Sequence, residues 1–375
     1  MLGFKTFREK LKSFNWTIFI LFFLLLVFGL TIQYSLSLGL ERETFFIFKK
    51  HLIFILLGIF FFFLFSFIDF RILNSVAFFL YFFTLILLSF VLVFGKTLQG
   101  VKGWFFFGPI YFQPVELAKI VLVIILAKIL AERAKRGVKV KEIFLNLIIL
   151  FPFILLIFFQ PDLGSALILL FVWLMMIVLN VRKIKYILYI FIIFLLTSLI
   201  FWHFVFKDYQ KARIITFFSP HQDPFGRGYQ ITQAKIAIGA GKLFGRGIGY
   251  GSQAQMRFLP ASRTDFVFAA FAEEFGFLGT SFLIFLFSLI FLKIVKISKS
   301  VYDDFGFFLI LGLAFNLFIQ VLISIGMNLG LLPVVGIPLP FISYGGSSLL
   351  MNSISLGIIQ SIIIHQKFTK REEIL

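Results

Sequence analysis

Long apolar stretches separated by short polar segments make up most of the chain. A helix of about 20 apolar residues is long enough to cross the ~30 Å hydrocarbon core of a bilayer. The pattern therefore predicts an all-α polytopic membrane protein that forms one domain over residues 1–375. The ten expected transmembrane helices lie at about residues 16–37, 51–69, 73–95, 114–131, 143–160, 163–181, 184–206, 265–292, 306–327 and 340–365.

The basic residues of the short loops favour one side of this predicted bundle. Lys and Arg occur before the first helix, after the last helix and in the loops near residues 71, 133–141, 182–185 and 293–299. The segments 160–162 and 328–339 contain neither. Because cytoplasmic loops carry an excess of Lys and Arg, the pattern predicts that both termini lie inside the cell.

The same alternation places a long basic loop, residues 207–263, on the outside between the seventh and eighth helices. This loop contains nine Lys or Arg residues, two Asp and no Glu. The charge rule that orients short loops does not govern a loop of this length, so its charge needs another cause. An outer basic loop that leads into an apolar helix indicates an enzyme acting on an anionic lipid headgroup.

Composition narrows the classes of chemistry. The chain is 61% hydrophobic with a formal net charge of +18, and it contains no Cys and four scattered His. Disulfides and thiolate metal sites are therefore excluded, and no His pair has the spacing of a zinc site. No phosphate-binding Gly-Lys-Ser/Thr loop occurs, so no nucleotide is expected. Nucleic acid is an unsuitable partner because the basic loop faces outward.

Ionisable residues inside membrane spans are costly and indicate functional sites. Glu116 and Lys119 lie three residues apart on one face of the fourth helix, as a buried ion pair or as part of a site. Asp162, in a tight turn, is expected to cap the sixth helix or to face a polar cavity. Asp265 either caps the eighth helix, a role open to Thr264 as well, or carries out chemistry.

Two further groups remain open. Glu273 and Glu274 follow Asp265 within the expected eighth helix, where their directions differ, so Glu273 is assigned a supporting role and Glu274 a partner within the bundle. The segment 337–348 combines Pro, Gly and Ser before the last helix. Such a segment at membrane depth either lines a polar cavity or allows close helix packing.

Several of these motifs, taken together and in order, resemble the SEDS family (shape, elongation, division and sporulation proteins). The resemblance covers nearly the whole chain and is strongest with the elongation branch, the RodA type. One departure occurs beside Glu116, where the family's usual Pro-Ser-Glu reads Pro114-Val115-Glu116. The matching motifs lie at residues 160–164, 228–239, 258–260, 264–269, 273–276 and 343–348.

The resemblance implies a peptidoglycan glycosyltransferase that polymerises lipid II on the outer face of the bacterial cytoplasmic membrane during cell elongation. Its essential aspartate maps onto Asp265, which is assigned as general base of an inverting displacement. A divalent cation, Mg²⁺ or Mn²⁺, is a candidate cofactor whose ligands are left open. The candidate substrate-binding residues are Trp104, Glu116, Lys119, Asp162, Arg213, Lys235, Arg246, Arg263, Ser343 and Ser347.

The resemblance also implies partners. A class B penicillin-binding protein of the penicillin-binding protein 2 type and the elongation machinery are expected, in addition to lipid II and the surrounding membrane lipid. Two other functions remain open at this point. A lipid II flippase would use the same basic loop and buried charges, and a scaffold would only recruit the transpeptidase.

Overall fold

The computed structural model describes most of the chain, and within it the protein is mostly helical. The described residues are 10–38, 42–98, 100–108, 110–134, 140–181, 185, 188–189, 192, 211, 215–219 and 226–372. The helices are α2 (Trp16–Ser35), α3 (Arg42–Phe67), α4 (Arg71–Phe94), α5 (Pro114–Glu132), α6 (Val140–Phe159), α7 (Leu163–Asn180), α10 (Arg227–Ala240), α11 (Ser252–Gln255), α12 (Val267–Ser298), α13 (Asp304–Asn328) and α14 (Gly346–Glu372).

Seven of the described helices are long and apolar enough to cross a membrane, namely α2, α3, α4, α7, α12, α13 and α14. The apolar part of α6, Ile143–Phe159, is shorter, and α5 carries four charged side chains. The structure thus supports a multi-pass membrane protein. The expected seventh helix, 184–206, lies almost entirely outside the described residues.

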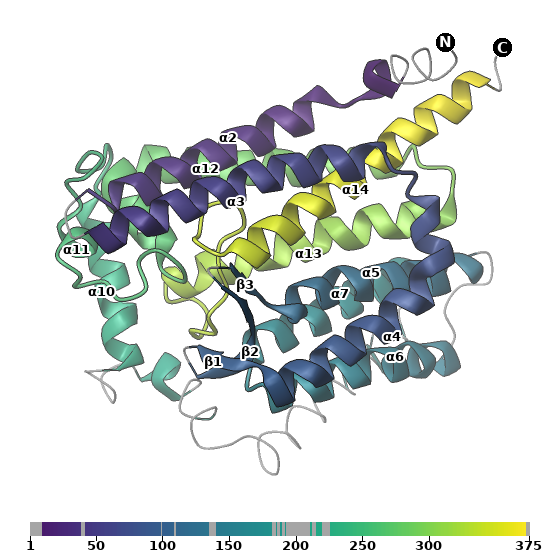
Figure 1. The fold of residues 1–375 in the computed structure, drawn as a ribbon, viewed down its shortest axis with the longest axis horizontal. Helices are drawn as coiled ribbons and strands as arrows, with labels where there is room; N and C mark the ends of the chain where they lie inside the picture. The colour runs from purple at the N-terminus through teal and green to yellow at the C-terminus, as the bar shows by residue number, and fades with distance from the viewer. Residues whose placement is uncertain are drawn as a thin grey trace.

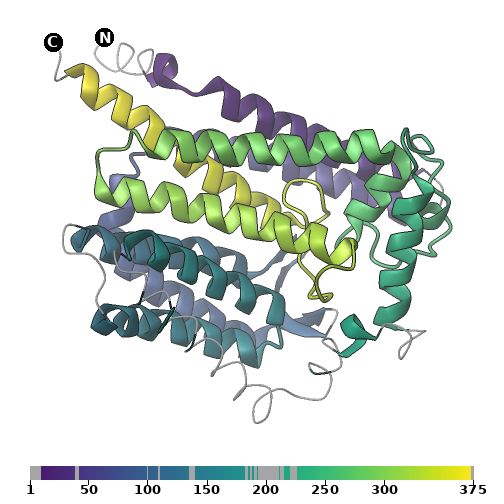
Figure 2. The same cartoon turned by 180° about the vertical axis from the view of Figure 1, so that it is seen from behind.

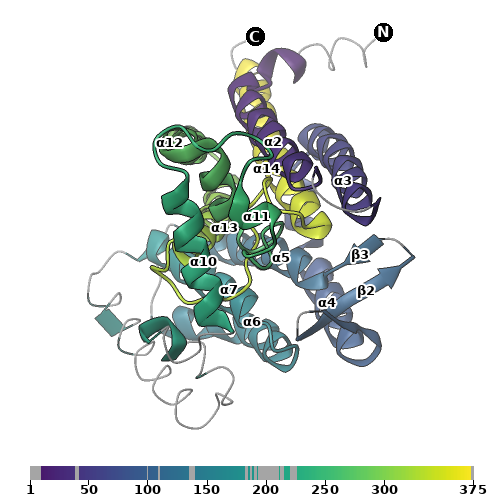
Figure 3. The ribbon, with the colours of Figure 1, turned by 90° about the vertical axis from the view of Figure 1, so that its left-hand side faces the viewer.

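The helices form one bundle whose centre is α13. It packs against α5, α7, α12 and α14, while α14 makes its most extensive contact with α3. Figures 1 and 2 show α2 beginning and α14 ending at one end of the bundle, with the strands, α10 and α11 at the other. Figure 3 looks directly onto that second end.

Some helix boundaries differ from those expected. α3 begins at Arg42 instead of residue 51. It includes two lysines, and each lies over an aromatic ring four residues earlier in the same helix. Lys49 lies 5.1 Å from the ring centre of Phe45, and Lys50 lies 4.6 Å from that of Phe46. The last helix begins at Gly346 instead of 340, since the Pro- and Gly-containing segment before it is irregular.

The expected eighth helix is broken. Gly276 in α12 has φ 66°, and the chain there meets a segment of the basic loop. The Arg246 N–H donates to the Glu273 carbonyl (2.9 Å), and the Phe277 N–H donates to the Lys242 carbonyl (2.8 Å). These bonds satisfy backbone groups that the break exposes. The helix beyond the break, about 22 residues or roughly 33 Å long, matches the hydrocarbon thickness.

Short elements that the sequence pattern did not predict complete the second end. Strands β1 (Lys96–Leu98), β2 (Val101–Phe107) and β3 (Ile110–Phe112) form an antiparallel sheet in the order β1-β2-β3. Part of the expected basic loop is the helix α10, which packs against α12. The sheet and α10 flank the cavity described next.

Candidate active site

A cavity of about 350 Å³ opens at this end of the bundle. Three residues singled out in the sequence, Trp104 of β2, Asp162 before α7 and Asp265 before α12, all line it. The remaining lining residues are Leu98, Val101, Gln113, Pro161, Gln230, Ala261, Thr264, Val334, Val335, Gly336, Pro338, Tyr344, Gly345 and Ser348. The segment 337–348 therefore lines a cavity through Pro338, Tyr344, Gly345 and Ser348, as the first of its two interpretations predicted.

The backbone that carries Asp265 is fixed by bonds from other elements. The Arg263 carbonyl accepts from the Tyr344 N–H (2.8 Å) and from Gln33 Nε2 of α2 (3.0 Å). Ser343 Oγ donates to the Thr264 carbonyl (2.5 Å). Asn328 Nδ2 at the end of α13 donates to the Asp265 carbonyl (2.8 Å). Three consecutive carbonyls are thus held by α2, α13 and the segment before α14.

The carboxylate of Asp265 does not cap α12, so that interpretation is wrong, and so is the one that gave the role to Thr264. The N-cap residue is Phe266, which makes no side-chain cap bond. The first turn is bonded instead by Asn328, whose Oδ1 accepts from the Ala269 N–H (3.0 Å). Asp265 Oδ2 lies 3.6 Å from where a β-carbon on Gly336 would sit, which places it against the opposite cavity wall.

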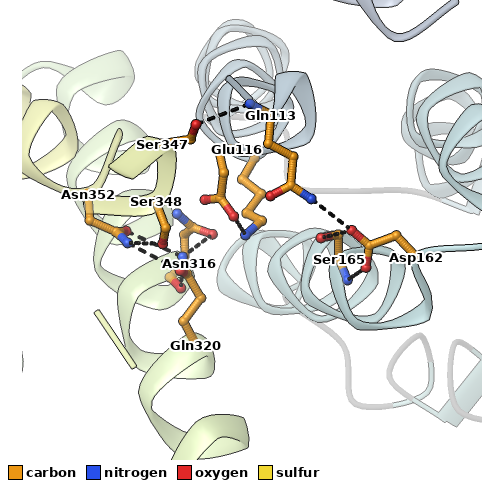
Figure 4. A network of polar contacts seen from close by, with 10 residues as sticks. Gln113, Glu116, Asp162, Ser165, Asn316, Gln320, Ser347, Ser348 and Asn352 are labelled. Carbon is orange, nitrogen blue, oxygen red and sulfur yellow. Dashed lines mark hydrogen bonds and ion pairs between the residues drawn. The ribbon is translucent and has the colours of Figure 1, made fainter. Parts of the chain in front are cut away.

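Asp162 is confirmed as the N-cap of α7, and it also lines the cavity. Its Oδ1 accepts from the Ser165 N–H (3.0 Å) and its Oδ2 from Ser165 Oγ (2.8 Å). Asp162 Oδ2 also accepts a third bond, from Nε2 of Gln113, the residue just before α5 (3.3 Å), as Figure 4 shows. The cap thus orients a carboxylate at the cavity and joins α5 to α7.

We expect Asp162→Asn to leave the protein folded and to remove most of the glycosyltransferase activity that the sequence resemblance implies. Asn caps a helix about as well as Asp, so the variant changes mainly the charge facing the cavity. Asp303→Asn is the matched control, because Asp303 Oδ2 caps α13 in the same way at the far end of the bundle (2.9 Å to the Gly306 N–H). Thermal unfolding and lipid II polymerisation are measured on both preparations. Full activity of Asp162→Asn would reduce Asp162 to a helix cap.

Glu116 and Lys119 form a buried ion pair within α5. The Lys119 Nζ–Glu116 Oε1 distance is 2.7 Å, and the side chains are 2% and 5% exposed. Figure 4 shows Glu116 between the Asp162 group and an amide cluster on α13 and α14. Neither residue is among those that line the cavity. Their helix reaches the cavity through Gln113, whose N–H donates to Ser347 Oγ (3.1 Å).

The amide cluster was not predicted. Gln320 Nε2 donates to Asn316 Oδ1 (3.2 Å), and Asn352 Nδ2 donates to Gln320 Oε1 (3.3 Å) and to Ser348 Oγ (3.2 Å). The available signal was the spacing, since Asn316 and Gln320 on α13 lie four residues apart on one helix face, as do Ser348 and Asn352 on α14. Ser348 connects this cluster to the cavity that it lines.

The other predicted substrate-binding residues do not line the cavity in the part of the chain that the structure describes. Arg246 donates to Ser252 Oγ within the basic loop (2.7 Å), and Arg263 donates to the Leu36 carbonyl at the end of α2 (2.5 Å). Lys235 is exposed on α10, and Arg213 lies outside the described residues. The two serines are buried with backbone partners, Ser343 at Thr264 and Ser347 at the Tyr111 carbonyl (2.9 Å).

The two glutamates of α12 bind neighbouring elements. Glu273 accepts from the Gln253 N–H (3.0 Å) and the Ala254 N–H (3.3 Å), so it holds the start of α11. Glu274 accepts from Ser35 Oγ of α2 (2.5 Å), which gives it the expected partner within the bundle. Glu273 therefore joins the basic loop to α12, and Glu274 joins α2 to α12.

The charges at the cavity bear on a metal ion. Asp162 and Asp265 are the acidic residues among its described lining residues, which include no Lys, Arg or His. The described residues contain no group of three His, Cys, Asp or Glu that could hold a metal ion without a substrate. Mg²⁺, however, is commonly held by one or two carboxylates together with substrate phosphates. The cavity fits that mode of binding.

Comparisons with known proteins agree along most of the chain. The FtsW/RodA/SpoVE family model, described as cell cycle protein, matches residues 15–368. The peptidoglycan glycosyltransferase MrdB of Escherichia coli is 36% identical over 301 residues, which cover 80% of this chain and 81% of MrdB. Stage V sporulation protein E of Bacillus subtilis is 32% identical over 355 residues, 92% of this chain and 95% of that protein.

Solved structures are similar in fold. The rod shape determining protein RodA of Thermus thermophilus has a TM-score of 0.69 and 27% identity, covering 94% of this chain and 97% of RodA. A chain from a peptidoglycan synthase complex, studied for its coordination of polymerization and crosslinking, has a TM-score of 0.79 and 29% identity. That match covers 94% of this chain and 98% of the other.

Proposed function

The chain belongs to the FtsW/RodA/SpoVE family of cell cycle proteins, and from this premise we propose how its cavity acts. The protein is a peptidoglycan glycosyltransferase that polymerises lipid II into glycan strands during cell elongation. The observation that carries this proposal is one cavity lined by Trp104, Asp162 and Asp265, with the backbone of Asp265 fixed by three other elements. A catalytic group needs that degree of fixation.

The reaction is a single displacement with inversion. The 4-hydroxyl oxygen of the acceptor sugar bonds to C1 of the donor sugar as the bond from C1 to the undecaprenyl diphosphate oxygen breaks. The electron pair of the broken bond leaves with the diphosphate, and Asp265 takes the proton of the hydroxyl. One carboxylate suffices, whereas glycosidases use two, because here the leaving diphosphate departs without protonation.

The leaving diphosphate needs positive charge, which the described cavity lining does not supply. A divalent cation held by Asp162 and the diphosphate oxygens would neutralise the charge that develops on the leaving group. Hydrogen bonds from Ser165 and Gln113 fix the orientation of the Asp162 carboxylate. Because Asp162 also lines the cavity, this carboxylate would meet a ligand there without rearranging. Lys119 supplies a second, buried positive charge in α5, whose N-cap residue Gln113 lines the cavity.

The proposed topology has ten transmembrane helices with both termini inside, in the bacterial cytoplasmic membrane. The cavity then faces the outer surface, where lipid II is polymerised. The arrangement in Figure 1 supports this proposal, since α2 begins and α14 ends at the end of the bundle opposite the cavity. The partner is a class B penicillin-binding protein of the elongation machinery, which the similarity to a synthase-complex chain supports.

The test is polymerisation of fluorescent lipid II by the purified full-length protein in detergent or liposomes. We expect glycan strands without an added partner enzyme. We also expect a divalent chelator to abolish polymer formation and added Mg²⁺ or Mn²⁺ to restore it. Transport of lipid II across liposome membranes without polymer would instead identify a flippase. Activity unchanged by the chelator would contradict the proposed cation.

A further inference from the structure

We propose that Asn328 is a positioning residue for Asp265. The inference rests on the proposed function and goes beyond it, because it assigns the orientation of the general base to a side chain on another helix. Asn328 is the last residue of α13, and its side chain is fully buried. No feature of the sequence pattern marks it.

The three hydrogen bonds of Asn328 join two elements. Its Nδ2 donates to the Asp265 carbonyl (2.8 Å) and to the Ser324 carbonyl in its own helix (2.8 Å). Its Oδ1 accepts from the Ala269 N–H (3.0 Å). The bond to Ser324 fixes the amide against α13, so the other two bonds fix Asp265 and the first turn of α12 relative to α13.

The bond to Ala269 takes the place of a local helix cap. Helices usually begin with a Ser, Thr, Asp or Asn whose side chain bonds the second or third N–H of the first turn. At α12 the N-cap position is held by Phe266, which is buried and has no such bond. Asn328 provides the acceptor from a distance, so Asp265 is not required to cap the helix.

The same residue also relates Asp265 to the opposite cavity wall. The chain continues from Asn328 into Val334, Val335 and Gly336, which line the cavity, and Asp265 Oδ2 faces Gly336. The turn between them is fixed, since the Leu331 N–H donates to the Gly326 carbonyl (2.8 Å). Asn328 thus sets the spacing between Asp265 and the cavity wall formed by Val334, Val335 and Gly336.

An amide is the side chain that this position requires, because it has one acceptor and two donor hydrogens. Alanine removes all three bonds. Aspartate keeps the shape and the acceptor for Ala269, but a carboxylate cannot donate to the Asp265 carbonyl. Displacing a catalytic group by about 1 Å can cost on the order of 100-fold in rate. We therefore expect kcat to fall by about 10–100-fold in Asn328→Ala and Asn328→Asp, with KM changed by less than about twofold.

The experiment measures lipid II polymerisation rates and hydrogen exchange of residues 265–272 in the full-length protein. Asn328→Ala should speed exchange in the first turn of α12. In an Asp265→Ala background it should cause no further loss of rate, since a residue that acts through Asp265 has nothing left to position. Asn180→Ala removes a buried amide at the C-terminal end of α7, away from Asp162 and the cavity. This control should change neither the polymerisation rate nor the hydrogen exchange.

The outcomes separate the two proposals. A wild-type protein that makes no polymer overturns the proposed function and this inference together. An active wild type with an Asn328→Ala variant of unchanged kcat overturns the role of Asn328 alone. A further loss of rate in the Asp265→Ala background would also overturn it, because the effect would then be general. If Asn328→Ala does not fold, Asn328→Asp, which keeps the helix-capping acceptor, decides by the same measurements.

Discussion

Asp265→Ala is expected to lower the rate of lipid II polymerisation at least 100-fold in a protein that remains folded. A positioned general base contributes about 10²–10⁴ in rate. The other acidic residue of the described cavity lining is Asp162, which is held as the N-cap of α7 and so cannot take over the role of Asp265. The bond from Asn328 runs to the backbone carbonyl of residue 265, which alanine retains. The first turn of α12 also keeps its cap, because the bond between Asn328 Oδ1 and the Ala269 N–H does not involve residue 265.

Asp303→Ala is the control for this variant. It removes a helix-capping carboxylate at the other end of the bundle, so it should cost about 0.5–2 kcal/mol of stability and leave polymerisation intact. Melting temperature, membrane insertion and polymer yield are compared at matched protein concentration. Near-normal glycan synthesis by Asp265→Ala would show that the base lies elsewhere.

Replacing both Glu116 and Lys119 with leucine should give a folded, membrane-inserted protein that has lost at least about 100-fold in activity. Buried ion pairs are often exchanged for apolar pairs at little cost in stability. The activity should fall because Lys119 is a buried cation in the second turn of α5, whose N-cap residue Gln113 lines the cavity, and removing one charge stabiliser typically costs about 10²–10³ in rate.

The single variants serve as the comparison. Lys119→Leu leaves the Glu116 carboxylate buried without its ion-pair partner, and breaking a buried pair costs about 3–5 kcal/mol. The double variant should therefore melt at a higher temperature than Lys119→Leu. Polymerisation at the wild-type rate in the stable double variant would show that the pair only holds the bundle together.

The class of multi-pass helical membrane protein was predictable because a bilayer requires long apolar helices, whatever the details of packing. The grouping of Trp104, Asp162 and Asp265 followed from the family resemblance, and the structure brings them to one cavity. Asn328 and Gln33 were not predictable. They lie 63 and 230 residues from the carbonyls that they bind, and no local pattern encodes contacts at such separations.

The same limit explains the break in α12, which the sequence pattern did not predict. The break in α12 depends on a partner segment some 30 residues earlier, so the apolar pattern through Gly276 indicated one unbroken helix. The basic loop was expected to bind substrate through Arg246 and Arg263. In the structure Arg246 donates to Ser252 Oγ and Arg263 to the Leu36 carbonyl, and their role toward substrate stays a prediction.

The backbone contact between residues 242–246 of the basic loop and α12 also means that the loop cannot be exchanged without changing the helix. Gly245 and Gly276 meet backbone to backbone, and a β-carbon on either one would overlap the main chain of the other segment. No change of side chain on the facing segment can relieve an overlap with main-chain atoms. A loop transplanted from a relative can therefore close onto this helix only if it places a glycine opposite Gly276. Any chimera that exchanges the loop has to be designed as a loop and a helix together.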